Sequence, residues 1–383
     1  MTDMVIKNGD VFVRGEGFQK VNIEINDRRI STLSGFMGNG QAEEIDAEGL
    51  YVIPGLVDIH FHGAMGHDFC DGDMEGLKEI AKYQASKGIL AICPATMTFT
   101  EEQLSVVMKK AAEFAENCHE DDKAELVGIN MEGPFISRDK IGAQNPLYIH
   151  KPDVDMFRRL QERARGLVKL LDIAPETEGA MELICRLKDE VRISLAHTDA
   201  DYEKAMEAYE KGAKHLTHLY NAMPGLVHRN PGPIRAAAES GATAELICDG
   251  IHVHPAMVRL AFEMFQNRMI LISDSMEAAG LGNGTFRLGG QKVAVVNNKA
   301  VLAEDTNTIA GSVTNLYDCM KNAIFKCHIP LEDAIRAATL NPAMAIGVSE
   351  DYGKIDVGNY ASLLLVDRDF HIRTIIHRGK IIR

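Results

Sequence analysis

Histidines and acidic residues follow a series of short apolar segments along this chain of 383 residues. The six that come directly after such a segment are His60, His62, Glu132, His197, His218 and Asp274. Imidazole and carboxylate groups are ligands that Zn²⁺ and other first-row divalent ions accept in proteins. One such residue after a strand usually satisfies a local hydrogen bond or begins a helix. Six in a series are hard to explain as coincidence, and they predict a divalent-metal site.

Two histidine pairs have the spacing H-x-H. In an extended segment, residues two apart point to the same side, so His60 and His62 can reach one ion. The second pair offers a further metal site as an alternative, but we interpret His252 as a substrate contact and His254 as a structural or loop residue. Arg229 lies in a loop of turn residues before a helix. Most such arginines are solvated, but this loop shares the predicted active face, which favours a phosphate contact.

The ligands require a fold that brings many strand ends together. The middle of the chain alternates apolar strands with helices; the strands are expected at 52–59, 89–93, 124–130, 169–173, 191–195, 214–216, 243–248 and 269–272. Repeated βα units with nearly continuous apolar strands indicate a parallel sheet with helices outside. About eight such units favour a (β/α)₈ barrel, whose functional residues lie at the C-terminal ends of the strands. No G-x-G-x-x-G opens a βα unit, so a dinucleotide-binding fold is not supported.

Both ends of the chain read as short strands separated by turns, which predicts one small β domain built from both termini. We place its boundaries at residues 1–53 and 349–383, with the barrel at 54–348.

Composition argues against several classes of protein: nucleic-acid-binding, disulfide-stabilised and membrane-spanning proteins. The net charge of −14 argues against general nucleic-acid binding. The seven cysteines include no C-x-x-C pair, which favours reduced thiols over disulfides. No apolar run reaches the roughly 18 residues that span a bilayer, and the first residues lack a signal-peptide pattern. We therefore expect a cytoplasmic protein without a membrane partner.

The segment PGLVDIHFHG at 54–63 resembles the first signature of the amidohydrolase superfamily. Further motifs resemble the N-acetylglucosamine-6-phosphate deacetylase family: EGPF at 132–135, AHT at 196–198, THLYNAM at 217–223, DGIH at 249–252, SDSM at 273–276, and residues 353–367. The resemblance covers essentially the whole chain, and HLYNAM is its most specific part.

That resemblance implies a barrel with a small β-sandwich formed by both termini, assembled as a homodimer. Glu132, His197 and His218 would hold the main divalent ion. His60 and His62 would permit a second ion, with Glu132 bridging the two. Zinc is the expected metal, with iron, manganese or cobalt as alternatives.

The resemblance also assigns the remaining site. Asp274 would be the catalytic acid and base. The positions expected to contact the phosphorylated sugar are Ala143, Gln144, Asn221, Ala222, Arg229, His252, Ile309, Ala310 and Gly311. Arg229 would serve the neighbouring subunit's site. Gln144 stands where some relatives have His, and its amide would hydrogen-bond the sugar or polarise the acetyl carbonyl.

The expected activity is metal-dependent hydrolysis of N-acetylglucosamine 6-phosphate to glucosamine 6-phosphate and acetate. A bound ion lowers the pKa of water toward about 7, and Asp274 would move a proton from that water to the leaving amine. Alternatives are the galactosamine epimer, another amide hydrolase of the superfamily, and a catalytically silent barrel that binds no metal. Carboxylated-lysine enzymes are a weaker match, because they place Lys where this chain has Glu132.

Overall fold

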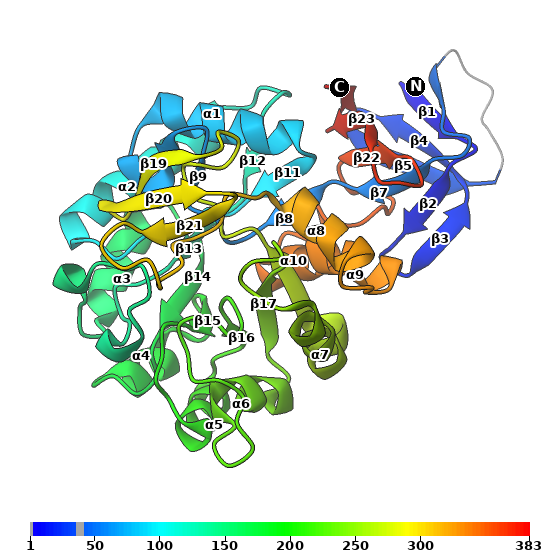
Figure 1. The fold of residues 1–383 in the computed structure, drawn as a ribbon. Coiled ribbons are helices and arrows are strands. Elements are labelled where there is room, and N and C mark those ends of the chain that lie inside the picture. Colours follow the sequence, from blue (N-terminus) through cyan, green and yellow to red (C-terminus); the bar gives the residue numbers. More distant parts are fainter. Residues whose placement is uncertain (1–2, 36–41) are drawn as a thin grey trace.

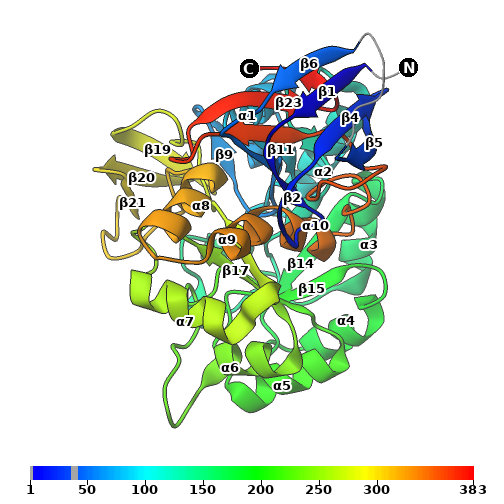
Figure 2. The same cartoon turned by 90° about the vertical axis from the view of Figure 1, so that its right-hand side faces the viewer.

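The computed structural model describes residues 3–35 and 42–383. Residues 1–2 and 36–41 of the predicted terminal domain lie outside this part of the chain. Figure 1 shows a large α/β body, coloured cyan to orange, and a smaller all-β region that contains both termini. The view in Figure 2, turned by 90°, shows the same two regions, with the blue and red strands together at the top.

The α/β body is a parallel barrel with eight strand positions among the described residues. They are β8 (Leu56–Asp58), β11 (Ile89–Ile92), β12 (Glu125–Leu126) with β13 (Ile129–Met131), β14 (Val168–Ile173), β15 (Arg192–Leu195), β16 (His215–Leu216), β17 (Thr243–Ile247) and β18 (Met269–Ile272). The N–H of Asp274, after β18, donates to the carbonyl of His60, after β8, at 2.9 Å and closes the ring. The predicted (β/α)₈ barrel is confirmed.

Helices cover the outside of the barrel (Figure 1). They are α1 (Met74–Ser86), α2 (Glu101–Asn117), α3 (Val154–Arg163), α4 (Ala180–Leu187), α5 (Tyr202–Lys211), α6 (Gly232–Ser240), α7 (Pro255–Phe265), α8 (Leu316–Phe325), α9 (Leu331–Ala338) and α10 (Leu340–Ala345). Helix α2 shows why they form here: Thr100 and Gln103 make a capping box at its start, and its buried residues recur every three or four positions. Within the described ranges, none of the helices has the length and apolar character needed to cross a membrane.

The expected strand at 52–59 is two strands in different sheets. Strand β7 (Tyr51–Pro54) belongs to the terminal region, whereas β8 belongs to the barrel. Gly55 separates them, and a Cβ at this position would lie 2.5 Å from Cδ1 of Leu90. Only glycine lets the chain pass this close to Leu90 of the barrel core, so the break between the two strands coincides with a tertiary contact.

The terminal region consists of two sheets. One has the order β5-β4-β1-β6 and the other β24-β23-β22-β7-β2-β3. Their strands are β1 (Met4–Lys7), β2 (Asp10–Val13), β3 (Gly17–Lys20), β4 (Asn22–Asn26), β5 (Arg29–Ser34), β6 (Glu43–Asp46), β22 (Leu363–Val366), β23 (Ile372–His377) and β24 (Lys380–Ile381). Buried residues of both sheets, such as Ile23 and Leu363, share one apolar cluster. This is the expected sandwich; its boundaries at 53/54 and 348/349 remain a prediction.

A three-stranded antiparallel sheet that the sequence analysis did not anticipate follows β18. It consists of β19 (Gly284–Leu288), β20 (Gln291–Val296) and β21 (Lys299–Leu302). Its inner residues form a separate apolar cluster with Met97 and Met276. The amide nitrogen of Gln291 donates to the carbonyl of Ala143 at 2.6 Å, which ties the sheet to the loop after β13. The other small elements are β9 (Gly63–Ala64), β10 (His67–Asp68) and four 3₁₀ turns at Phe69–Asp71, Arg138–Lys140, Pro146–Tyr148 and Gln266–Arg268.

Candidate metal centre

A cavity of about 310 Å³ opens at the C-terminal ends of the barrel strands. Of the predicted site residues, those that line it are His62, Glu132, Ala143, Gln144, His197, His218, Asn221, Ala222, His252, Asp274, Ile309 and Gly311. His60 is fully buried behind this wall, and Ala310 is buried next to two lining residues. Arg229 is exposed in the loop before α6 and does not line the cavity of its own chain.

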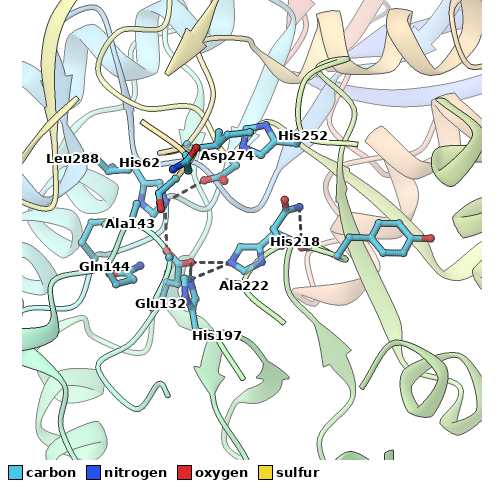
Figure 3. Close-up of a pocket in the computed structure, with 18 residues that line it drawn as sticks. His62, Glu132, Ala143, Gln144, His197, His218, Ala222, His252, Asp274 and Leu288 are labelled. Carbon is cyan, nitrogen blue, oxygen red and sulfur yellow. Dashed lines mark hydrogen bonds and ion pairs between the residues drawn. The ribbon is translucent and has the colours of Figure 1, made fainter. Parts of the chain in front are cut away.

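Glu132 lies at the centre of the cluster, directly after β13. Its Oε1 is 3.0 Å from Nε2 of His197 and 3.2 Å from Nε2 of His218. Its Oε2 is 3.3 Å from Nε2 of His62 and 3.7 Å from Nε2 of His60. Figure 3 shows His62 and Asp274 on one side of Glu132, and His197 and His218 on the other. One carboxylate thus joins two groups of donors, each able to hold an ion.

We call His197 and His218 the two-strand half of the centre, because they follow β15 and β16. We call His60 and His62 the single-segment half, because both follow β8. In the two-strand half, Nδ1 of His197 donates to the carbonyl of Lys140 at 2.9 Å. This contact leaves the lone pair of Nε2 directed at Glu132.

The single-segment half is arranged in the same way. Nδ1 of His60 donates to Glu245 at 2.9 Å, and Nδ1 of His62 faces the carbonyl of Ala95 at 3.3 Å. Both Nε2 atoms therefore lie on the side of Glu132, where each can bind an ion when its imidazole is neutral. A second contact on the far nitrogen is typical of histidines that bind metals.

These donors fit a divalent cation. Nε2 of His60 and Oε2 of Glu132 are buried without a hydrogen-bond partner among the described residues. Nε2 of His197 and Nε2 of His218 lie only 3.2 Å apart, and both face the same oxygen. A tetrahedral ion with Zn–N bonds of about 2.0–2.1 Å places its ligand nitrogens roughly 3.3 Å apart. The spacing of these nitrogens therefore fits the ligand set of such an ion.

Asp274 reaches the same cluster from β18. Its Oδ1 is 3.2 Å from Nε2 of His62 and 3.9 Å from Nε2 of His60. Burial works to raise the pKa of Asp274, but the hydrogen bond from His62 and the charge of His60 outweigh it and lower the pKa. The same balance, with His60, His197 and His218 opposing burial, holds the pKa of Glu132 well below its ordinary value. Both carboxylates are therefore ionised at neutral pH.

Three of these residues have backbone conformations that side chains rarely adopt. His197, His218 and Asp274 have φ of 44°, 28° and 48°. Each left-handed residue costs about 1–3 kcal/mol and persists only where the surrounding structure imposes it. The turn at each strand end directs these side chains into the cavity, so part of the folding free energy goes into placing them.

A further histidine, His252, lines the cavity beside Asp274 (Figure 3). Nδ1 of His252 is 2.8 Å from Oδ2 of Asp249, whose Oδ1 accepts the backbone N–H of His252. Burial works to lower the pKa of His252, but Asp249 outweighs it and raises the pKa. An imidazolium at this place can attract an anion despite the negative net charge of the chain. The interpretation of His254 as a loop residue agrees with its position as the N-cap of α7.

Gln144 has a fixed orientation. Its Oε1 accepts the backbone N–H of Thr98 at 2.7 Å, so the amide offers its Nε2 hydrogens for other contacts. Asn221 is arranged in the opposite sense, because its Nδ2 donates to the carbonyls of His218 and Leu219 at 3.2 Å. The pair therefore offers one donor group and one acceptor group.

Sequence reasoning missed several residues of the site. Additional side chains that line the cavity are Met97, Tyr220, Leu288, Asn307 and Thr308. Leu288 ends β19, and Asn307 and Thr308 follow β21, so they come from the sheet that was not anticipated. Glu245, inside β17, was also missed. His215 of the neighbouring strand β16 is hydrogen-bonded to it at 3.0 Å.

Burial works to raise the pKa of Glu245, but the charges and hydrogen bonds of His60 and His215 lower it to about 2. The fully buried Asp172 of β14 behaves in the opposite way. Burial and then the charges of Glu132 and Glu245 raise its pKa well above the ordinary value. The pKa values of two buried acids of one barrel interior thus shift in opposite directions, because only Glu245 is hydrogen-bonded to histidines.

Comparison with known proteins identifies close similarities. Residues 51–382 match the amidohydrolase family. N-acetylglucosamine-6-phosphate deacetylase of Bacillus subtilis (strain 168) is 36% identical over 386 residues, covering 99% of this chain and 96% of the relative. N-acetylgalactosamine-6-phosphate deacetylase of Escherichia coli O157:H7 is 31% identical, covering 88% and 89%.

Among solved structures, a mutant N-acetyl-D-glucosamine-6-phosphate deacetylase of Mycobacterium smegmatis, in complex with N-acetyl-D-glucosamine-6-phosphate, has a TM-score of 0.92. It is 29% identical in sequence, and the match covers 100% of this chain and 99% of that chain.

Proposed function

The chain belongs to the amidohydrolase family, and from this membership and the geometry of the centre we propose that it deacetylates N-acetylglucosamine 6-phosphate. The reaction is hydrolysis of the N-acetyl group, giving glucosamine 6-phosphate and acetate. The observation that carries the proposal is a carboxylate, Glu132, shared by two groups of histidines, with the ionised Asp274 beside them in one cavity.

A divalent ion held by Glu132 and the histidines would make a water molecule more acidic and polarise the acetyl carbonyl. Asp274 accepts a proton from the water molecule that adds to the acetyl carbon. The protonated Asp274 then gives the proton to the sugar nitrogen as the C–N bond breaks, because an amine leaves poorly as its anion. The Nε2 hydrogens of Gln144 are available to hydrogen-bond the sugar or the acetyl oxygen.

His252 contacts the phosphate in this proposal, since Asp249 keeps its imidazole charged. Arg229 supplies a second cation. Because it is exposed on its own chain, we propose that it reaches the cavity of a neighbouring subunit in a homodimer. The other predicted contacts with the sugar are Ala143, Asn221, Ala222, Ile309, Ala310 and Gly311.

Zinc is our proposal for the metal, because imidazole and carboxylate donors suit it and the nitrogen spacing of the two-strand half matches its tetrahedral geometry. Two ions can be held, one in each half. A cytoplasmic location is part of the proposal, since the seven cysteines in the described residues are free thiols, as in a reducing compartment.

The test is acetate release from N-acetylglucosamine 6-phosphate, measured beside the unphosphorylated sugar and the galactosamine epimer, with the metal content of the same sample determined. We expect preference for the phosphorylated glucosamine form and loss of turnover on chelation. Equal turnover of the unphosphorylated sugar would contradict the roles of His252 and Arg229. A metal-loaded protein that releases acetate from none of them would contradict the proposed reaction.

A further inference from the structure

A buried carboxylate outside the cavity touches both halves of the metal centre. Glu245 lies in the middle of β17, and its side chain is fully buried. Its Oε2 is 2.9 Å from Nδ1 of His60 and accepts the backbone N–H of His218 at 3.2 Å. Its Oε1 is 3.0 Å from Nε2 of His215. Glu245 does not line the cavity, so any effect on the reaction passes through these neighbours.

The contact with His60 decides which nitrogen carries the proton. Oε2 of Glu245 already accepts the backbone N–H of His218 and meets Nδ1 of His60 as an acceptor too, so the hydrogen of the imidazole lies on Nδ1. The lone pair is then on Nε2, which faces Glu132 and has no hydrogen-bond partner among the described residues. Histidine binds a metal ion through its unprotonated nitrogen. Glu245 therefore holds His60 in the tautomer that can bind an ion.

His215 fixes Glu245 from the other side. Its Nδ1 is 2.5 Å from Oγ1 of Thr243, which lies at the start of the same strand. With Nδ1 accepting from Thr243, Nε2 carries the hydrogen that Glu245 accepts. Hydrogen bonds therefore lead from Thr243 through His215 and Glu245 to His60. The contacts of Glu245 with His215 and His60 are buried.

The two halves depend on this network to different degrees. His197 takes its orientation from the carbonyl of Lys140, which Glu245 does not touch. His218 meets Glu245 only through its backbone N–H. Loss of the carboxylate therefore removes the 2.9 Å partner of Nδ1 of His60 and leaves this atom with a 3.4 Å contact to Nδ2 of Asn130. The imidazoles of His197 and His218 keep their present contacts.

We propose that Glu245 is a positioning residue that enables the single-segment half to hold the second ion of a two-ion centre. The inference rests on the proposed metal-dependent function. It predicts that the Glu245→Gln variant keeps the ion of the two-strand half and binds the second ion more weakly. Contacts of this kind typically change metal affinity 10–100-fold.

The experiment is metal titration of protein first stripped by chelation. Mn²⁺ is added, bound ions are counted by mass spectrometry, and electron paramagnetic resonance distinguishes a coupled ion pair from an isolated ion. We expect two ions and a coupled spectrum for the natural chain. For E245Q we expect one ion at unchanged affinity, a second at roughly 10–100-fold lower affinity, and the spectrum of an isolated ion at low loading.

Asp172→Asn is the matched control, because Asp172 is another fully buried acid of the barrel but is hydrogen-bonded to Thr217 instead of a ligand imidazole. It should bind both ions. If E245Q fails to fold, the Glu245→Asp variant keeps the charge and shortens the reach to His60, and it should also weaken only the second ion. Equal binding of both ions by the folded variant, loss of both, or a single ion in the natural chain would overturn the proposal. Acetate release by the natural chain tests the proposed function separately.

Discussion

The two halves of the metal centre use the same ligand type but are assembled differently. His60 and His62 come from one extended segment, so their common direction follows from the backbone alone. His197 and His218 come from neighbouring strands, so their proximity depends on the register of these strands. Leu195 pairs with Leu216, and each histidine lies two residues after the leucine of its own strand. A slip of one residue between β15 and β16 would separate them. One half is thus fixed by local sequence and the other by the barrel.

The difference extends to how each half is stabilised. The two-strand half uses left-handed backbone turns at His197 and His218. The backbone of His60 and His62 does not have positive φ, and their side chains are oriented by buried hydrogen bonds. Because Glu132 joins both halves, a change at Glu132 should affect both ion sites, whereas a change in one half should affect one ion site.

The largest effect is expected where both halves meet. Glu132→Gln should abolish the binding of both ions and reduce acetate release to background, because the amide offers one neutral acceptor in place of two charged ones. Metal analysis after dialysis, together with a turnover assay, measures this. Tight binding of even one ion by the variant would contradict the bridging role.

Asp274→Asn should be the next most severe change. It should lower kcat about 10²–10⁴-fold, the usual contribution of a positioned acid and base, while both ions and KM are retained. Asn keeps the shape of the side chain but cannot accept the proton. Steady-state kinetics on variant protein with its metal content verified provide the measurement. Turnover near that of the natural chain would exclude Asp274 as the proton carrier.

A single substitution in either half should remove one ion and leave the other. His60→Asn should remove the ion of the single-segment half, and His197→Asn the ion of the two-strand half, each leaving about one ion bound per chain. Combining His60→Asn with Glu245→Gln should weaken metal binding no more than His60→Asn alone, because residues that act through one contact are not additive. Ion counting on the three variants checks both statements.

The smallest effect should come from the wall that carries His252. Since Asp249 raises the pKa of His252, the imidazolium persists to higher pH than that of an ordinary histidine and is lost as the pH rises through this elevated pKa. KM for the phosphorylated sugar should then rise roughly tenfold, as expected when one charged hydrogen bond is lost. The KM of an unphosphorylated sugar and that of His252→Gln should lack this rise. An unchanged KM at alkaline pH would contradict the phosphate contact.

Much of this arrangement could be predicted from the sequence, because ligands at the ends of parallel strands must converge. Glu245 escaped that reasoning because it lies within a strand. The signal was nevertheless present: a glutamate in the apolar run TAELIC is costly to bury unless it has partners. The predicted role of Arg229 is of a different kind, because it depends on a second subunit and not on the fold of its own chain.

Elements were harder to predict where the chain departs from the βα repeat. The sheet β19–β20–β21 has two-residue turns at Gly289-Gly290 and Asn297-Asn298, all with positive φ. Such turns between alternating strands are a hairpin signal that could have revealed it. The division of 52–59 into two strands depends on the contact between Gly55 and Leu90, which only the assembled barrel provides.

The pairing of β7 with both ends of the chain also has a consequence for biosynthesis. Strand β7 pairs with β2 on one edge and with β22 on the other. About 300 residues separate β7 from β22. At about 5–20 residues per second, their translation takes roughly 15–60 s. Throughout that interval the nascent chain carries an open strand edge, which is a site of unwanted pairing. Strand β7 leads directly into β8, which precedes His60 and His62, so this late-closing sheet adjoins the first residues of the candidate metal centre.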